Sequence, residues 1–501
     1  MQPQLAGNNI AVLKTHNKKS MPDNVDVLIV GAGIAGICAA YYLQKYCPEM
    51  SFTILEARET LGGTWDQFRY PGVRSDSDAF TLSFSFKPWR RPEAIACGDV
   101  ILEYIKEAAE EVGLKNHTHF RHKVSSASWD SGKSLWTANV QDANGDLTKI
   151  TCKYLYMCTG YFDQETGYQP EWEGRDKFQG DFVHPQNWPE NLDYAGKKVV
   201  VIGSGATAIS MIPEIAKTAG HTIMLQRSPT YIFSRRRKYL LTNILRYILP
   251  TRVGFAIART KAGLSNLMLY QICRRMPGVA RFFVKMHNRR KLGYKFDTTT
   301  HFTPRYAPWD QRFCLDADSD FFKSVREGRA TIVTDHISHF VEDGIILKSG
   351  EKLEADIIVS STGLNMRIMG GIDIQVDGQP INTGKLVNYK GVMFGEVPNL
   401  INAQGHVNAS WTLRCEYGAA YFTRLMKHME KKKYTVCTPR NHENDIDDKT
   451  SFFLRSGYVM RARHHWPKQG KTRPWKVYDN QFLDQWALSQ GEIDDGVLEF
   501  S

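Results

Sequence analysis

Two glycine-rich motifs of the G-x-G-x-x-[G/A] type, at residues 31–36 and 203–208, constrain what this chain can fold into. The first follows the apolar run 27–30 and the second follows the apolar run 199–202. Each therefore has the strand–turn–helix setting that a dinucleotide-binding motif requires. The glycines let the backbone close a tight turn and approach a pyrophosphate, which then lies at the N-terminus of the following helix. Two such motifs predict two dinucleotides bound at once.

The residue that ends the next strand indicates which dinucleotide each motif binds. After the first motif this residue is Glu56, whose carboxylate accepts hydrogen bonds from ribose hydroxyls and repels a 2′-phosphate. After the second it is Gln226, followed by Arg227 and Ser228, a cation and a hydroxyl that suit a 2′-phosphate. The economical assignment is FAD in the first site and NADPH in the second; the alternative is that one motif is an ordinary glycine-rich turn. The positions expected to contact the two nucleotides are Gly31, Gly33, Gly36, Gly203, Gly205 and Thr207.

Length and cysteine usage narrow the class of protein. A chain of 501 residues is too long for one hydrophobic core, so two or three domains are expected. The nine cysteines include no C-x-x-C pair, which argues against a disulfide framework, a metal site or a thioredoxin-reductase type of flavoprotein. Residues 1–24 are polar, without the apolar core of a signal peptide, and are expected to be a disordered lead-in. A reducing, cytoplasmic location fits best.

The net charge of +11 comes from one stretch, residues 235–295, which holds sixteen Lys and Arg and no Asp or Glu. Its cations alternate with apolar blocks at helical spacing, which predicts a basic helical insertion. Such a segment can lie on an anionic membrane. The alternative that we favour is a lid whose cations face solvent or guide NADPH. Nucleic-acid binding is not expected, because no recognised motif accompanies the charge.

Two similar apolar strands, within residues 154–160 and 356–363, each end on a glycine and return the chain from a nucleotide-binding unit. We therefore expect an α/β fold with two Rossmann-like dinucleotide-binding domains, the second inserted in the first. The expected divisions are residues 25–168 and 364–501 for the FAD-binding domain, 169–234 and 296–363 for the NADPH-binding domain, and 235–295 for the helical insertion.

Residues 178–189, FQGDFVHPQNWP, match the signature F-x-G-x-x-x-H-x-x-x-W-P of Baeyer–Villiger monooxygenases, the class B flavoprotein monooxygenases. The related N- and S-oxidising flavin monooxygenases typically have Tyr in place of the Trp. A second family signature comprises residues 62–65 (GGTW), residues 70–72 (YPG) and Asp76. From about residue 25 onward the chain resembles this family, and within it the ethionamide-activating branch of mycobacteria. The signature residues are Phe178, Gly180, His184, Trp188 and Pro189.

The resemblance implies a reaction in which NADPH reduces FAD and the flavin adds dioxygen at C4a. The peroxyflavin then converts a ketone to an ester or lactone, and sulfides or thioamides are oxidised at sulfur. Arg312 matches the family's active-site arginine, which stabilises negative charge without giving up a proton. Asp76 matches the carboxylate that orients this arginine. Without the resemblance, Arg312 would be read as a surface or interdomain ion pair and Asp76 as a capping carboxylate.

Further roles follow from the same resemblance. Thr64, Trp65 and Asp66 would lie near the flavin, although packing of a glycine-rich loop is the alternative. His184 would couple domain movement to NADPH binding, with a structural histidine as the alternative. Gln311 stands where the family commonly has a lysine that binds the 2′-phosphate, so Arg227 and Ser228 would carry more of that preference.

Two other functions stay open at this stage. One is a flavin monooxygenase that acts mainly on soft nitrogen or sulfur nucleophiles. The other is an NADPH-dependent flavin reductase or a membrane-associated binding protein with the same fold. Neither the physiological substrate nor the oligomeric state follows from the sequence.

Overall fold

The apolar runs on either side of the first glycine motif form neighbouring parallel strands. β1 (Asn24–Val30) pairs with β2 (Phe52–Glu56) and with β6 (Leu147–Met157), and helix α1 (Ile34–Tyr46) connects β1 to β2. β1 is buried on both faces, as parallel strands covered by helices are. The order across this first sheet is β20 (Gln379–Pro380), β19 (Asp373–Val376), β4 (Lys123–Asp130), β5 (Leu135–Gln141), β6, β1, β2 and β3 (Thr118–Phe120), with β23 (Leu400–Asn402) also paired to β6.

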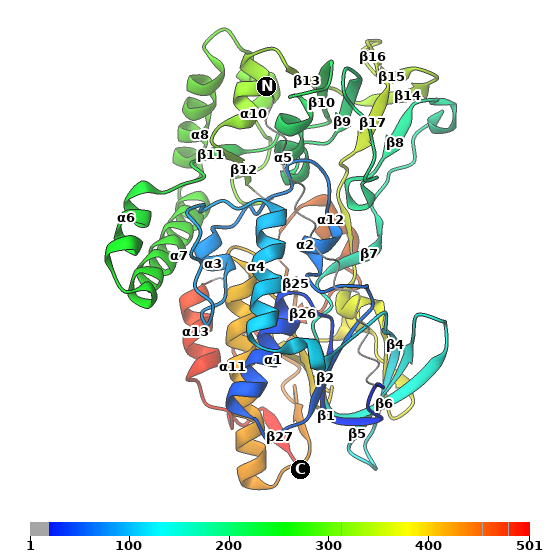
Figure 1. Cartoon of the computed structure of the whole chain (residues 1–501), viewed down its shortest axis with the longest axis vertical. Coiled ribbons are helices and arrows are strands. Elements are labelled where there is room, and N and C mark those ends of the chain that lie inside the picture. Colours follow the sequence, from blue (N-terminus) through cyan, green and yellow to red (C-terminus); the bar gives the residue numbers. More distant parts are fainter. Residues whose placement is uncertain (1–19, 312, 453, 479) are drawn as a thin grey trace, which may run out of the picture.

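The computed structural model describes residues 20–311, 313–452, 454–478 and 480–501 (Figure 1). Most of the expected lead-in, residues 1–24, lies outside the described residues, and β1 already begins at Asn24. Arg312 also lies outside them.

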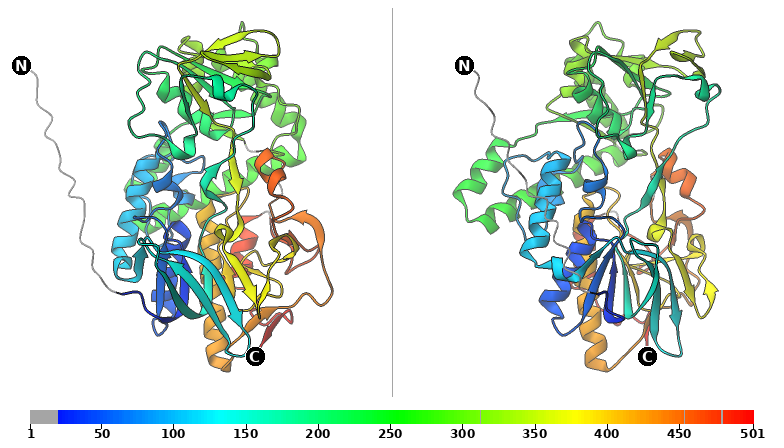
Figure 2. Two further views of the ribbon diagram at one scale, coloured as in Figure 1. Left: turned by 90° about the vertical axis from the view of Figure 1, so that its right-hand side faces the viewer. Right: turned by 45° about the vertical axis from the view of Figure 1, so that its right-hand side comes forward.

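A second parallel sheet contains the strand before the second glycine motif. Its order is β13 (Ala330–Thr334), β10 (His221–Gln226), β9 (Lys198–Ile202), β17 (Ile357–Ser360) and β8 (Asp181–Val183). Helix α5 (Ala206–Ile215) follows β9, and the antiparallel strands β14 (Ile337–Val341), β15 (Gly344–Leu347) and β16 (Lys352–Glu354) lie between β13 and β17 in the chain. In Figure 1 this sheet lies above the first one along the long axis, and Figure 2 shows the same arrangement from the side.

The chain enters and leaves the second sheet once. All strands of the second sheet fall within residues 181–360, whereas the first sheet takes strands from before and after that range. The two connections, β7 (Phe162–Gly167) and β18 (Leu364–Met366), pair antiparallel. The fold is therefore α/β with two dinucleotide-binding units, the second inserted in the first, as the sequence predicted. The residue boundaries of the domains stay a prediction.

Helices cover the first sheet and carry much of its core. α1, α4 (Gly98–Glu111) and α11 (Trp411–Lys432) pack on one face, where α1 and α11 lie against each other (Figure 1). All nine cysteines are free thiols. The shorter helices are α2 (Thr64–Gln67), α3 (Ala79–Leu82), α9 (Thr298–Phe302), α10 (Asp320–Arg326), α12 (Gly457–Ala462) and α13 (Gln481–Ser489).

The basic stretch forms helices, as its periodicity predicted: α6 (Leu240–Ile248), α7 (Thr251–Arg275) and α8 (Pro277–Leu292). α7 is attached to the first unit, because Arg259 donates to the Ser83 carbonyl (2.7 Å) and ion-pairs with buried Glu416. α8 packs on the second unit, where the His287 ring lies 4.7 Å from that of Phe233. The insertion thus bridges both units. Within the described part of the chain, no helix is long and apolar enough to cross a membrane.

Candidate functional site

A cavity of about 660 Å³ opens at the carboxyl ends of β1, β2 and β6. Ligands of open α/β sheets bind outside the carboxyl ends of the strands, and this volume falls in the usual range of cofactor sites. Residues of the first motif and of the GGTW segment meet here with Trp411 at the start of α11. The lining residues that the sequence singled out are Gly31, Gly33, Glu56, Thr64, Trp65 and Asp76.

The glycines of the first motif have two separate uses. Gly31 has φ +107°, and a Cβ there would lie 2.6 Å from the Cys158 carbonyl oxygen. A Cβ at Gly36 would lie 3.1 Å from the Gly31 carbonyl carbon. These two glycines therefore allow the turn and the helix packing. Gly33 and Gly63 instead face each other across the cavity wall, so their bare backbone lets a cofactor approach closely.

The Glu56 carboxylate is held by the backbone of the turn. One oxygen accepts a hydrogen bond from the Ala32 amide (2.7 Å) and the other from the Arg58 amide (2.9 Å). Each carboxylate oxygen has a second lone pair, so the group still has acceptors for ribose hydroxyls. The buried position of Glu56 on the cavity wall fits the predicted role.

Asp66 lies differently from its two neighbours in the GGTW segment. Thr64 and Trp65 line the cavity, whereas the buried Asp66 carboxylate binds the guanidinium groups of Arg58 and Arg69, each at 2.6 Å. Arg58 lines the cavity. The described contacts of Asp66 are thus with arginines, and its predicted contact with the flavin stays a prediction.

Asp76 lines the cavity, and its catalytic role stays a prediction. Its predicted partner Arg312 lies outside the described residues, so the Asp76–Arg312 pair stays a prediction.

Arg74 joins this cavity to the second unit, and sequence reasoning missed it. Its side chain is 4% exposed and lies 4.0 Å from the buried carboxylate of Asp316 on β12 (Cys314–Ala317). It also donates to the Ile209 carbonyl in α5 (3.4 Å). Burial lowers the pKa of Arg74 and raises the pKa of Asp316 to about 6. Because the partners lie more than 130 residues away along the chain, no local pattern pointed to this contact.

A second buried set at the cavity was also missed. His406 lines the cavity and donates from Nε2 to Asp484 in α13 (2.7 Å), and Arg414 in α11 forms an ion pair with the same carboxylate oxygen (2.7 Å). Burial lowers the pKa of His406. Although burial opposes it, the nearby Arg414 and His406 lower the pKa of Asp484. Asp484 lies 70 residues or more beyond His406 and Arg414 in the chain, so only the fold brings it to them.

The second glycine motif forms an open cradle. Gly203 has φ +126°, and a Cβ there would overlap the Ser361 carbonyl, with its carbon at 3.0 Å. Gly205 precedes α5, and a Cβ there would meet nothing within 4 Å. Thr207 lies in the first turn of the same helix. The helix N-terminus with a bare glycine before it is a suitable site for a pyrophosphate.

The residues at the end of β10 divide between the core and the surface. Gln226 is buried and donates to the His301 carbonyl and the Thr334 hydroxyl, each at 2.9 Å. Arg227 and Ser228 are exposed just beyond it. In the described part of the chain no hydrogen bond or ion pair is recorded for the Arg227 side chain. The guanidinium therefore stands near the cradle with its charge available to a ligand.

The signature residues 178–189 follow the first connection between the units. A Cβ at Gly180 would lie 2.5 Å from Cζ of buried Phe178, so this position needs glycine. His184 donates from Nε2 to the Gly363 carbonyl (3.2 Å), and its ring fills the space where Gly167 would carry a Cβ. Burial lowers the pKa of His184, which favours the neutral ring. Trp188 lies edge-on to Tyr194, with ring centroids 6.5 Å apart, and Pro189 is exposed.

His184 thus touches both connecting strands, since Gly167 ends β7 and Gly363 precedes β18. This position fits a residue that responds to movement between the units, and the coupling itself stays a prediction.

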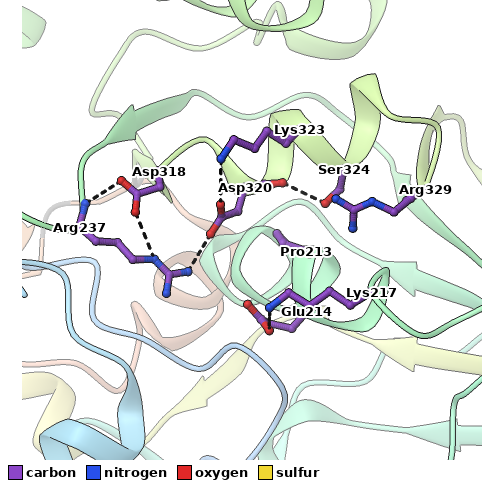
Figure 3. A pocket seen from close by; sticks show the side chains of 9 residues that line it. All are labelled: Pro213, Glu214, Lys217, Arg237, Asp318, Asp320, Lys323, Ser324 and Arg329. Atoms are coloured by element: carbon purple, nitrogen blue, oxygen red, sulfur yellow. Dashed lines mark hydrogen bonds and ion pairs between the residues drawn. The ribbon is translucent and has the colours of Figure 1, made fainter.

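A smaller cavity of about 240 Å³ lies on the second unit near α5 and α10 (Figure 3). Its cations are paired with acids of the same region: Arg237 with Asp318 and Asp320, and Lys217 with Glu214. Figure 3 shows Arg237 between the two aspartates. The internal neutralisation of these charges distinguishes this cavity from a phosphate site.

Comparisons with known proteins agree with this geometry. A family model described as flavin-binding monooxygenase-like matches residues 91–369, and one described as an NAD(P)-binding Rossmann-like domain matches residues 29–91. The probable FAD-binding monooxygenase AlmA of Acinetobacter baylyi is 44% identical over 96% of this chain and 97% of its own. The FAD-containing monooxygenase EthA of Mycobacterium tuberculosis is 41% identical over 96% of this chain and 98% of its own.

Solved structures share the fold at lower identity. An oxidised steroid monooxygenase bound to NADP superposes with a TM-score of 0.75 at 20% identity, covering 95% of this chain and 99% of its own. An open form of cyclohexanone monooxygenase gives 0.75 at 19% identity, covering 96% and 100%. Together with the sequence relatives, these matches support FAD and NADPH as the cofactors.

Proposed function

The chain belongs to the flavin-binding monooxygenase-like family, and we propose that it is a Baeyer–Villiger monooxygenase dependent on NADPH and FAD. It converts ketones to esters or lactones with dioxygen as co-substrate, and it also oxidises the sulfur of sulfides or thioamides. The observation that carries this proposal is the signature segment 178–189, with Trp188 and Pro189 at its end, directly after the connection between the two nucleotide units.

The first unit binds FAD through the glycine-rich turn after β1 and through the carboxylate of Glu56. The backbone at Gly33 and Gly63 admits the pyrophosphate, and Glu56 accepts hydrogen bonds from the ribose. Bound FAD, once reduced by NADPH, supplies the activation of dioxygen. Thr64 and Trp65 form part of the wall against the flavin.

The second unit holds NADPH at the cradle before α5. Gly205 leaves room for the pyrophosphate, and Arg227 with Ser228 binds the 2′-phosphate beyond β10. The Arg227 guanidinium lies on the surface and would pair with a partly solvated 2′-phosphate. It therefore contributes mainly to the preference for NADPH over NADH, and less to the affinity for the rest of the nucleotide.

Asp76 and Arg312 act on the reacting oxygen. Arg312 stabilises the negative charge that develops there, and Asp76 fixes the direction of the guanidinium. The position of Asp76 on the cavity wall supports this role.

The test measures NADPH oxidation and product together on a matched ketone and sulfide. The wild type is expected to form both ester and sulfoxide. Arg312→Ala and Asp76→Ala should keep FAD but lose product formation by about 10²–10³, and the double variant should be far less than additive. Near wild-type ketone oxygenation by Arg312→Ala would contradict the assigned pair. Sulfoxide without any ester from the wild type would instead identify a flavin monooxygenase of soft nitrogen or sulfur nucleophiles.

A further inference from the structure

Helix α6 presents its apolar face to solvent and its polar face to the protein. Leu240, Leu241 and Ile248 are 72%, 72% and 71% exposed. On the other side Asn243 donates to the Pro92 carbonyl (2.9 Å), and Arg246 donates to the carbonyls of Arg91 (3.2 Å) and Trp89. A helix on the surface of a water-soluble domain normally has the opposite arrangement.

The neighbouring helix α7 extends this apolar surface. Val253, Ile257, Leu264 and Met268 are all exposed, and their spacing places them on one face of the helix. α6 packs closely on α7, because a Cβ at Gly254 would lie 2.9 Å from the Arg246 Cα. The two helices project together from the side of the molecule (Figures 1 and 2). Exposed apolar side chains on two helices that pack on each other mark a candidate interaction site.

The helical insertion that carries this surface has charged side chains of one sign. Residues 235–295 contain sixteen Lys and Arg and no acid. Some of these cations bind acids elsewhere, as Arg259 does with Glu416. Within the described residues, no ion pair is found for Arg252 and Arg275 of α7. The same holds for Lys285, Arg289 and Arg290 of the neighbouring α8, and for Arg236 and Lys295 outside the helices.

We propose that α6 and α7 form a docking surface for an anionic lipid bilayer, with the apolar face of α6 inserted among the headgroups. Burial of apolar side chains at the boundary of the acyl chains contributes favourable binding free energy, and so does the attraction of each nearby cation to the negatively charged membrane surface. Charge favours this partner over a second copy of the chain, because a symmetric contact would bring two cationic surfaces together.

The docking surface lies close to the large cavity. On its inner side α7 donates from Asn266 to the Asn408 carbonyl (2.6 Å), and Ala409 and Trp411 of that segment line the cavity. One helix therefore separates the bilayer from the cavity wall. If the proposed function holds, lipophilic ketones or sulfides dissolved in the membrane are the substrates that this placement favours.

The test is flotation of the purified, FAD-loaded full chain with vesicles. We expect binding to vesicles that contain phosphatidylglycerol, at least tenfold weaker binding to pure phosphatidylcholine, and loss of binding in high salt. The double variant Leu241→Glu/Ile244→Glu should bind at least tenfold more weakly than wild type. Both side chains are exposed, so the variant should fold normally.

Leu147→Glu is the matched control, because Leu147 is 74% exposed at the start of β6, away from α6 (Figure 1). It should bind vesicles as the wild type does. Absence of wild-type binding at low salt would overturn the proposal, as would unchanged binding of the α6 variant. A dimer in light scattering that the α6 variant dissociates, without vesicle binding, would assign the surface to a second copy. Flotation needs no turnover, so its outcome is independent of the proposed activity.

Discussion

The variant Gly205→Ala, which adds one methyl group, should weaken NADPH binding and leave the stability of the fold nearly unchanged. Gly205 has φ −77° and ψ −179°, which alanine adopts freely, and its Cβ would meet no protein atom within 4 Å. The free energy of unfolding should therefore change by less than about 1 kcal/mol. The same methyl would occupy the space where the pyrophosphate approaches α5. We expect the KM for NADPH to rise about tenfold or more in Gly205→Ala, with FAD content unchanged.

Gly203→Ala, two residues away, should lower the stability of the fold, whereas Gly205→Ala should not. At φ +126° an alanine costs about 1–2 kcal/mol, and overlap with the Ser361 carbonyl adds about 1–3 kcal/mol. This variant should unfold at a temperature several degrees lower. Thermal unfolding and the kinetics of flavin reduction by NADPH measure the two effects separately.

Gly278→Ala is the control for a glycine with open space outside the cradle, and it should change neither quantity. Wild-type affinity for NADPH in Gly205→Ala would show that the nucleotide does not bind in front of α5.

Three further predictions concern the nucleotide preference, the signature histidine and the contact between the units. Arg227→Ala should raise the KM for NADPH about tenfold or more with little change for NADH, and an equal rise for both would remove Arg227 from the 2′-phosphate site. Gly167→Ala should displace the His184 ring and slow flavin reduction as His184→Ala does; reduction at the wild-type rate in both variants would leave His184 without the predicted coupling role. Because burial raises the pKa of Asp316 to about 6, above its unfolded value of about 3.9, the folded state retains a proton between these values. The contribution of Asp316 to the free energy of unfolding should fall as the pH rises from about 4 to about 6 and then level off. Thermal unfolding of Asp316→Asn should show a weaker dependence on pH over this range.

Local patterns predicted the nucleotide units well. The alternation of an apolar run, a glycine turn and a helix is a short-range property, so β1 with α1 and β9 with α5 lie where the motifs placed them. The helices of the basic insertion followed from spacing in the same way. The insertion of one unit in the other followed from two similar strands far apart in the chain.

The sequence did not predict the direction in which individual side chains point. The sequence showed that residues 235–295 combine cations with apolar blocks, but the amphipathic pattern does not say which face of α6 meets the protein. That choice depends on hydrogen bonds from Asn243 and Arg246 to carbonyls near residue 90. The two ion pairs of the Asp66 carboxylate likewise could not be predicted from the sequence, and its position near the flavin stays a prediction.

The sequence by itself determined the two nucleotide motifs, the acid at Glu56, the cation at Arg227 and the family signature, because each is written within a few consecutive residues. Only the tertiary structure decided that Arg74 reaches Asp316, that His406 joins Asp484 and Arg414 at the cavity, and that α6 turns its leucines outward. The contacts of Asp316 and Asp484 join segments that are distant along the chain, and the direction of α6 depends on its hydrogen bonds to residues 89–92. Their energy comes from burial and charge pairing after the units have packed, and no local pattern encodes that packing.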